Sequence, residues 1–407
     1  MKLLLWLTIL AVLTAACVRD LPAPASLPTA APIQPTAQTL PPSQPTPTKY
    51  VPAQGKTLFP SCQLDPNAVQ TLVPPEAPAP SAAAAAGKSA TLRSLAEQRG
   101  LNFGTSVGAG SFNKPAEVEL LTRQFNMLAV ENAMKWEVIH PEPERYDFSE
   151  ADQIVAFARA NGMSVYAHVL VWENQLSPWL VERAYSRDEL IDLLCRHIKT
   201  VVGRYRGQVY AWDVVNEAFD PDGTLRNNLW TRGIGPEVIA MAFQWAREAD
   251  PDALLIYNDV AGEGMNQKSQ AIYALAQGLL KLGAPLDGIG MQMHVWLDGP
   301  PTQQELSENM QRLADLGLQV HITEMDVRTQ YSSLSEAEKL TAQAEFYASA
   351  MRACLGASNC TTFVVWGLTD AHSWIPYFYG PDIPLLFDGN YQPKAAYFAL
   401  LEALTFP

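Results

Sequence analysis

Two glutamates that are far apart in the sequence each follow a short apolar run, and together they could do acid–base chemistry. Glu217 lies in the segment WDVVNEA just after the run 209–215, and Glu324 lies in ITEMDV after the run 319–323. Glycosidic bond hydrolysis needs two facing carboxyl groups, one to protonate the leaving oxygen and one to stabilise or attack the anomeric carbon. The sequence does not give their separation, which is about 5 to 5.5 Å for retention and roughly 6.5 to 9.5 Å for inversion.

Polar and aromatic side chains lie at or just after seven successive apolar runs. A single Asn or Asp in such a place is usually a turn former, and a lone His is usually a satisfied core residue. Seven successive run ends with amide, carboxylate, imidazole or indole groups are harder to explain in this way, so we interpret them as one site. The set consists of Glu131, Asn132, Lys135, His168, Trp172, Asn216, Glu217, Asn258, Asp259, Gln292, His294, Glu324, Asp326, Trp366 and Asp370.

Eight apolar runs that alternate with amphipathic helical patterns must position these side chains. The runs cover residues 103–107, 126–130, 164–170, 209–215, 254–257, 288–293, 319–323 and 362–366. This alternation predicts the α/β class and a (β/α)8 TIM barrel, whose active site forms at the carboxyl ends of the strands. An open doubly wound sheet is the alternative, but no glycine-rich phosphate loop follows any run.

The start of the chain has the features of an export signal. Residues 1–17 combine the charge of Lys2, an apolar run from Leu3 to Leu13 and small residues before Cys17, which together predict a signal peptide. The apolar run is too short to span a bilayer comfortably. Cys17 resembles the cysteine of a bacterial lipobox, although Thr14 stands where that motif usually has Leu. We expect an exported protein, either a cell-surface lipoprotein anchored through Cys17 or a plainly secreted extracellular one.

Residues 18–88 are rich in Pro, Ala and Thr, and residues 89–407 are predicted to form the catalytic domain. A segment as rich in Pro, Ala and Thr as residues 18–88 buries too little apolar area to fold, so we expect it to be a mostly disordered linker. A small ordered piece near Cys62 stays open. The composition fits a stalk that holds a catalytic domain away from a membrane or wall, and it fits an indifferent linker nearly as well.

The five cysteines fit an oxidising compartment. Cys354 and Cys360 are close enough in the sequence to staple a short loop, and we predict a disulfide between them. Cys195 lies in a helical pattern, where we expect a buried free thiol. A bridge between Cys62 and Cys195 is the alternative, with no support in the sequence.

The charge of the chain limits its partners. With 28 basic and 42 acidic side chains, the formal charge is −14. We therefore expect no nucleic acid and no anionic membrane surface as the main partner, because both need clustered Lys and Arg. The hydrophobic fraction of 48% is ample for a large core.

Seven sequence segments carry a family resemblance, and they occur in the order FNMLAVENAMKW, HVLVWENQ, WDVVNEA, YND, GIGMQMH, ITEMDV and WGLTDAHSW. Through them, residues 89 to 405 resemble family 10 of the glycoside hydrolases, the endo-1,4-β-xylanase family. The resemblance implies a TIM barrel that cleaves β-1,4-xylosidic bonds internally and with retention, by double displacement. It also implies no metal and no cofactor, with xylan or xylo-oligosaccharides as the partner. We expect a monomer.

The resemblance also implies residue roles. Glu217 is implied as the acid/base, which must hold its proton until it donates, and Glu324 as the nucleophile. His294 and Asp326 then support Glu324 by holding it ionised and oriented, and Asn216 bonds the sugar 2-hydroxyl group. Sugar-binding positions are implied for Glu131, Asn132, Lys135, His168, Trp172, Gln175, Gln292, Trp366 and Trp374.

Two of these positions, Trp366 and Trp374, are implied as aromatic walls. An indole above the sugar ring can exclude a C6 hydroxymethyl group, which would favour xylose over glucose. Asp213, inside the run 209–215, is expected to have a structural hydrogen-bonding role.

Three positions depart from the family pattern. Glu173 stands where the family usually has His, and Val260 and Ala261 stand where it usually has Tyr and Asn. The last two fall where leaving-group sugars would bind, and Glu173 could change the pH dependence or the fit of decorated chains. One alternative function is therefore the hydrolysis of another β-glycan or an aryl β-glycoside. Another is a tethered xylan-binding lipoprotein without turnover, but both carboxyl groups that turnover needs are present.

Overall fold

A computed structural model describes residues 58–63 and 90–406 of the chain. The predicted signal peptide with Cys17 and the other parts of the predicted linker lie outside the described residues. Among the residues described, no helix combines the length and the apolar character that crossing a membrane requires.

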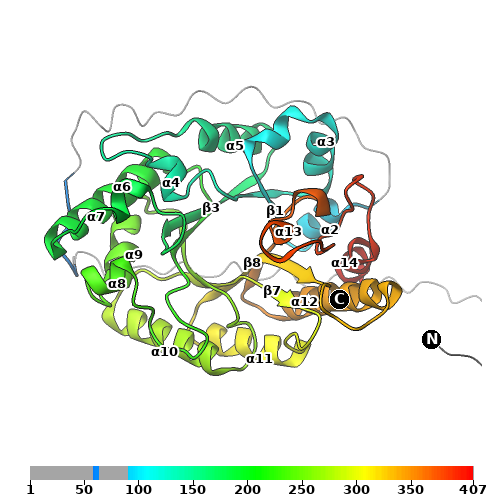
Figure 1. Cartoon of the computed structure of the whole chain (residues 1–407). Helices are drawn as coiled ribbons and strands as arrows, with labels where there is room; N and C mark the ends of the chain where they lie inside the picture. The colour runs from blue at the N-terminus through cyan, green and yellow to red at the C-terminus, as the bar shows by residue number, and fades with distance from the viewer. Residues whose placement is uncertain (1–57, 64–89, 407) are drawn as a thin grey trace, which may run out of the picture. The chain divides into compact units, whose positions relative to one another are not determined.

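Eight parallel strands close into a barrel, and the helices surround them (Figure 1). The ring closes because β6 pairs with β8, with Ile289 opposite Val320, and because β1 pairs with β9, with Gly104 opposite Val364. The (β/α)8 prediction is therefore confirmed, and the open sheet is excluded. The strands are β1 (Asn102–Val107), β2 (Met127–Val130), β3 (Ser164–Val171), β4 (Ala211–Asn216), β5 (Leu254–Asp259), β6 (Gly288–Met291), β8 (Gln319–Arg328) and β9 (Cys360–Val365).

A ninth short strand, β7 (His294–Trp296), pairs only with the far end of β8. The sequence predicts one strand over 288–293, but Met293 has a positive φ of 66°, and the chain turns there. His294 is thereby placed opposite Asp326 in the register of β7 and β8. The predicted run 319–323 also continues to Arg328, so that Glu324 and Asp326 lie within a strand and not after one.

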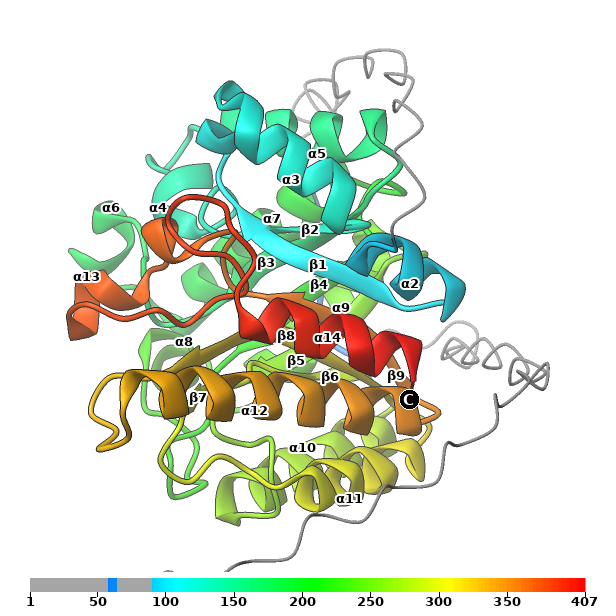
Figure 2. The same cartoon turned by 90° about the vertical axis from the view of Figure 1, so that its right-hand side faces the viewer.

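Several of the helices that cover the barrel start at capping residues that satisfy free backbone N–H groups. Ser186, Thr302 and Ser335 each form a capping box with a glutamate three residues later. Figure 2 shows α12 and α14 side by side on one flank of the barrel. The longer helices are α2 (Leu92–Gln98), α3 (Pro115–Gln124), α5 (Ser149–Ala160), α7 (Arg187–Arg204), α9 (Val238–Ala249), α10 (Gln267–Leu282), α11 (Gln303–Ala314), α12 (Glu336–Gly356) and α14 (Ala395–Thr405).

Short helices lie in the connections. They are α4 (Trp136–Ile139), α6 (Pro178–Val181), α8 (Leu229–Gly233) and α13 (Ile375–Tyr379), with 3-10 turns at Ala109–Asn113 and Asp370–His372.

The core has two layers because successive side chains of a strand point to opposite faces. In β2, Leu128 and Val130 belong to the large cluster between strands and helices, whereas Met127 and Ala129 belong to a small cluster inside the barrel. Tyr166 and Trp366 are members of that inner cluster. An apolar inner layer therefore packs beside the polar groups of the site.

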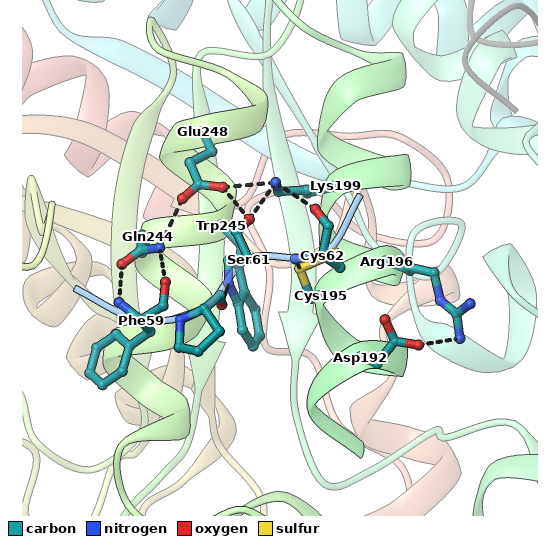
Figure 3. The surroundings of a disulfide bond; sticks show 11 residues. Phe59, Ser61, Cys62, Asp192, Cys195, Arg196, Lys199, Gln244, Trp245 and Glu248 are labelled. Atoms are coloured by element: carbon teal, nitrogen blue, oxygen red, sulfur yellow. Dashed lines mark hydrogen bonds and ion pairs between the residues drawn. A yellow bond between two sulfur atoms is a disulfide. The ribbon is translucent and has the colours of Figure 1, made fainter. Parts of the chain in front are cut away.

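Residues 58–63, which we call the strap, lie against α7 and α9 (Figure 3). Gln244 of α9 accepts from the backbone N–H groups of Leu58 and Phe59 at 2.8 and 2.9 Å, and it donates to the carbonyl of Phe59 at 2.9 Å. The Trp245 indole donates to the carbonyl of Pro60 at 3.1 Å. An ordered piece is thus present in the region that the sequence assigns to the linker.

The strap ends in a disulfide between Cys62 and Cys195 (Figure 3). The expectation that Cys195 is a free thiol is wrong, because the sequence pattern around it showed a helix but could not show which segment packs on that helix. The predicted disulfide between Cys354 and Cys360 is confirmed.

Candidate active site

Glu324 lies within β8 and is only 4% exposed. Its Oε1 accepts a hydrogen bond from the Asn258 amide at 2.6 Å, and its Oε2 lies 3.2 Å from Nε2 of His294. The two carboxylate oxygens are therefore held by different partners on different strands. This arrangement fixes the orientation of the carboxylate, as a nucleophile requires.

His294 connects Glu324 to Asp326. The other ring nitrogen of His294, Nδ1, lies 2.7 Å from Oδ2 of Asp326. Burial alone would lower the pKa of His294, but the two carboxylates outweigh it and raise the pKa to about 10. The imidazolium therefore carries a positive charge beside Glu324 at neutral pH. The predicted supporting pair of His294 and Asp326 is present.

Glu217 directly follows β4 and has a left-handed backbone conformation with φ 55°. Such a conformation is uncommon for a residue with a side chain, and surrounding structure must hold it. Its backbone N–H donates to the carbonyl of Asn258 at 2.9 Å. Its Oε1 accepts from Nε2 of Gln292 at 3.0 Å, and its Oε2 lies 3.4 Å from Nη1 of Arg226. Its side chain is 13% exposed.

The two glutamates belong to one network at the carboxyl ends of the strands. Asn216 Oδ1 accepts from Asn258 at 3.0 Å and from Gln292 at 3.1 Å. When the Asn216 amide is turned over, its oxygen accepts instead from the Trp172 indole at 3.2 Å. Asn258 donates to Glu324 and Gln292 donates to Glu217, so a chain of amides connects the two carboxyl groups.

His168 is buried between the inner layer and the network. Its Nδ1 lies 2.8 Å from Oδ2 of Asp213, whose other oxygen accepts from the Tyr166 hydroxyl at 2.9 Å. Burial lowers the pKa of His168 to about 4, although the nearby Glu324 acts in the opposite direction. A neutral ring can donate from Nδ1 to the carboxyl group of Asp213. Asp213 therefore has the expected structural role, which is to orient His168.

Lys135 is the centre of a second polar group. Its Nζ donates to Asn132 at 2.8 Å and to Gln175 at 2.7 Å, and it lies 5.2 Å from the centre of the Trp172 ring. Burial lowers its pKa, although nearby glutamates counteract this. Glu131 is in the same group, and burial raises its pKa against the influence of Lys135. These predicted sugar-binding residues therefore lie together.

The predicted aromatic walls also lie beside the carboxylates. The Trp374 indole donates to Oδ2 of Asp326 at 2.9 Å, and its ring lies 5.0 Å from that of His294. The Trp366 ring lies 5.2 Å from that of His168. Hydrogen bonding and ring contacts thus fix both indoles beside the proposed nucleophile and its partners.

The structure adds residues that we did not assign to the site. Asn258 was noted as a polar residue at a strand end, but its contacts with Glu324 and Asn216 could not be foreseen. Glu137 accepts from Gln175 at 2.7 Å. Arg226 reaches Glu217 from the loop after β4, and no sequence pattern pointed to it.

Two members of the polar set prove to be structural, so our interpretation of the whole set as one site was too broad. Asp259 forms a buried ion pair with Lys268 at 2.7 Å, and Asp370 forms one with Lys394 at 2.9 Å. Val260 and Ala261, which depart from the family pattern, follow directly after β5, where Val260 is half-buried and Ala261 is exposed.

One group could hold a metal by geometry alone. His168, Asp213 and Glu324 each bring a ligand atom within 4.8 Å of the others. These atoms already have hydrogen-bonding partners, and the cationic His294 lies directly beside Glu324. Hydrogen bonding therefore accounts for the group.

Comparisons with known proteins agree with the geometry. The model of glycosyl hydrolase family 10 matches residues 91–403. Endo-1,4-β-xylanase B of Thermotoga neapolitana is 44% identical over 317 residues, which are 77% of this chain and 91% of that protein. The crystal structure of xylanase 10B from Thermotoga petrophila RKU-1 in complex with xylobiose is 44% identical, with a TM-score of 0.76 over 79% of this chain and 98% of that one. The crystal structure of native xylanase 10B from Thermotoga maritima is also 44% identical in sequence. It has a TM-score of 0.75 and covers 78% of this chain and 98% of that one.

Proposed function

The chain belongs to glycosyl hydrolase family 10, and from that premise we propose that it hydrolyses internal β-1,4-xylosidic bonds of xylan with retention of configuration. The observation that carries the proposal is the environment of Glu324. A cation on one side and an amide on the other hold this carboxylate within the same network as Glu217. The relatives named above are xylanases, and one of them binds xylobiose.

In the first step, Glu324 attacks the anomeric carbon while Glu217 gives its proton to the leaving oxygen. The bond between the sugar and the leaving oxygen breaks, and a covalent glycosyl-enzyme forms at Glu324. Charge then moves off Glu324, and the proton has left Glu217. The hydrogen bonds from the Asn258 amide and the His294 ring to Glu324 then weaken as the carboxylate loses its charge. Neither side chain has to move for this to happen.

In the second step, Glu217 acts as a base and takes a proton from water. The water oxygen attacks the anomeric carbon from the face that the leaving sugar vacated, and the bond between that carbon and Glu324 breaks. The Glu324 carboxylate is thereby released, Glu217 is protonated again, and the β configuration is restored. Asn216, which lies between the two carboxyl groups in the amide chain, is placed to bond the 2-hydroxyl group, a contact that strengthens toward the transition state.

The sugar on the non-reducing side would bind to the Lys135 group and His168, between the indoles of Trp366 and Trp374. Because Asp326 holds the Trp374 indole at 2.9 Å, that ring cannot easily move away from a larger sugar. The ring would therefore exclude a C6 hydroxymethyl group and favour xylose over glucose.

The substrate assignment is tested by comparing xylan, cellulose and mannan with purified protein. We expect reducing ends from xylan alone, and Trp374→Ala should narrow the preference for xylo- over cello-oligosaccharides. A protein that cleaves all three glycans equally would support the broader alternative of a general β-glycanase. A protein that binds xylan without cleaving it would support the non-catalytic alternative.

We also propose that the protein is exported and tethered through lipidated Cys17, with residues 18–57 as a spacer. The support is in the sequence, namely the apolar run from Leu3 to Leu13 and the small residues before Cys17. Growth of a bacterial host with labelled palmitate tests it. The label should appear in the full chain and be absent from Cys17→Ala, whereas an unlabelled, freely secreted protein would exclude the tether.

A further inference from the structure

Glu173 lies at the edge of the site, and the two steps above do not use it. Its Oε1 forms a direct ion pair with Nη1 of Arg226, and the same nitrogen lies 3.4 Å from Oε2 of Glu217. The side chains of Glu173, Arg226 and Glu217 are 29%, 16% and 13% exposed, so water screens them only partly. One guanidinium nitrogen therefore joins the proposed acid/base to a carboxylate that takes no part in the chemistry.

The loop after β4 fixes the guanidinium. Nε of Arg226 donates to the carbonyl of Phe219 at 3.1 Å, and the backbone N–H of Arg226 donates to the carbonyl of Ala218 at 2.8 Å. A bridge between Phe219 and Leu225 closes the loop at its base. With Nε held by the loop, Nη1 extends toward Glu173, which follows β3, and toward Glu217.

The charges decide what this arrangement does. A guanidinium beside a carboxyl group favours the ionised form, but a general acid must keep its proton until the leaving group departs. Arg226 is firmly charged, because the two glutamates outweigh the effect of burial and raise its pKa. Arg226 alone would therefore oppose the role of Glu217 as a general acid. The negative charge of Glu173 offsets that effect and also disfavours a second negative charge nearby.

We propose that Glu173 is a positioning residue that holds Arg226 and offsets its charge, so that Glu217 keeps its proton to higher pH than it would beside Arg226 alone. This inference rests on the proposed role of Glu217 as the acid/base. It also gives a physical consequence to the departure from the family pattern at position 173.

Other charged and titratable groups act on Glu217, and they come from several elements. Lys135 after β2, His168 on β3, and Tyr257 and Asp259 on β5 interact with Glu217 through their charges. Asp220 in the same loop contacts Arg226, and Glu324 and His294 lie in the same network. The substitution of Glu173 alone keeps all of these side chains in the protein. A shift in the pH profile of such a variant therefore reports the charge of Glu173.

The test is the pH profile of kcat/KM for xylohexaose, measured for wild type and Glu173→Gln. Glutamine keeps an acceptor oxygen for Arg226 and removes the charge. We expect the basic limb to move to lower pH by about half a unit or more, with the maximal kcat/KM within about twofold of wild type. Glu173→Asp keeps the negative charge, so its basic limb should lie close to that of wild type. Asp220→Asn is the matched control, because Asp220 lies 3.4 Å from Nε of Arg226 but is 50% exposed, so its shift should be smaller.

A second substrate separates charge from structure. Dinitrophenyl β-xylobioside has a leaving group that needs no proton, so Glu173→Gln should leave its kcat/KM profile in place. A basic limb on xylohexaose that stays in place or moves to higher pH would overturn the inference, as would an equal loss of rate at every pH. Should Glu173→Gln fail to fold, the same shift of the basic limb to lower pH is expected for Glu173→His, at pH values where that histidine is neutral. Wild type that does not cleave xylohexaose would instead refute the proposed function.

Discussion

At the scale of single residues, the neighbours of the two glutamates give them different chemistry. Glu324 touches the imidazolium of His294 and the amide of Asn258, which both favour a negative charge. Glu217 accepts from the amide of Gln292, and the guanidinium near it is shared with Glu173. The proposed nucleophile and the proposed acid/base thus lie in different environments, as in other carboxyl pairs with divided roles.

The first prediction concerns the charge of His294. Its pKa of about 10 lies above the usual 6.5, so its proton stabilises the fold. This contribution is complete below about pH 6.5 and is lost as the pH rises through about 10. NMR titration of the imidazole, assigned with His294→Gln, should give a midpoint near 10 in wild type and a lower one in Asp326→Asn. A wild-type midpoint near 6.5 would contradict the proposed cation.

The second prediction concerns Glu217→Ala. On xylan, removal of the acid/base should lower turnover by about 10²- to 10⁴-fold. On dinitrophenyl β-xylobioside the first step needs no acid, so the glycosyl-enzyme should form quickly and then accumulate. Azide needs no base to attack, so it should restore turnover and give the β-glycosyl azide. If azide has no effect, or if the product is the α-azide, Glu217 is not the acid/base of a retaining enzyme.

Sequence reasoning found both glutamates and the supporting His294 and Asp326, because each lies at or near the end of an apolar run. It could not find the contact of Arg226 with Glu217. Arg226 is nine positions beyond Glu217 and returns only because the loop folds back through the bridge of Phe219 and Leu225. Periodicity shows where strands end, but it does not show which loop residue comes back.

At the scale of elements, the pairing of β7 with β8 builds the nucleophile's surroundings. The turn at Met293 places His294 opposite Asp326, and β8 continues past Glu324 instead of ending before it. The apolar run ends at residue 323, where the charged Glu324 follows, so the sequence pattern predicts the end of the strand there. Both acidic residues are nevertheless at strand positions, where they alternate with the buried apolar side chains of Met325 and Val327.

The third prediction concerns the two disulfides. They close segments with sequence separations of 133 and 6 residues, for which loop-closure entropy gives about 5 and about 2 kcal/mol. Replacing Cys62 and Cys195 by alanine should therefore lower the melting temperature more than replacing Cys354 and Cys360, which serves as the matched pair. Calorimetry of the two double variants measures this. An equal or smaller loss for the first pair would mean that the strap detaches before the barrel unfolds.

At the scale of the whole molecule, the barrel and the strap form the described part of the chain. The strap contacts α7 and α9, and none of its hydrogen bonds reaches a proposed site residue. The composition of the long N-terminal stretch predicted a linker, and it could not predict that Cys62 docks on a helix more than a hundred residues away. Tertiary pairing of cysteines depends on the folded surface and not on local pattern.

The fourth prediction follows from this separation of strap and site. A chain of residues 57–407, which keeps the strap and its disulfide, is the reference for kcat/KM on xylo-oligosaccharides. A chain of residues 90–407 with Cys195→Ala should keep kcat/KM within about twofold but melt at lower temperature, since the strap contacts and disulfide are gone. Activity assays and thermal melts of both chains measure the kcat/KM and the melting temperature that are compared. A large loss of kcat in the shorter chain without unfolding would show that the strap acts on the site.

The measurement that tests the central claim most directly is trapping of the covalent intermediate. A 2-deoxy-2-fluoro-β-xylobioside with a dinitrophenyl leaving group slows the second step, so that the sugar stays on the nucleophile. Peptide mass spectrometry should then find one added xylobiosyl group, on the peptide of wild type that contains Glu324, and none on Glu324→Ala. A label on another carboxylate would contradict the assignment of Glu324. The absence of any label, with early products of inverted configuration, would contradict the retaining mechanism itself.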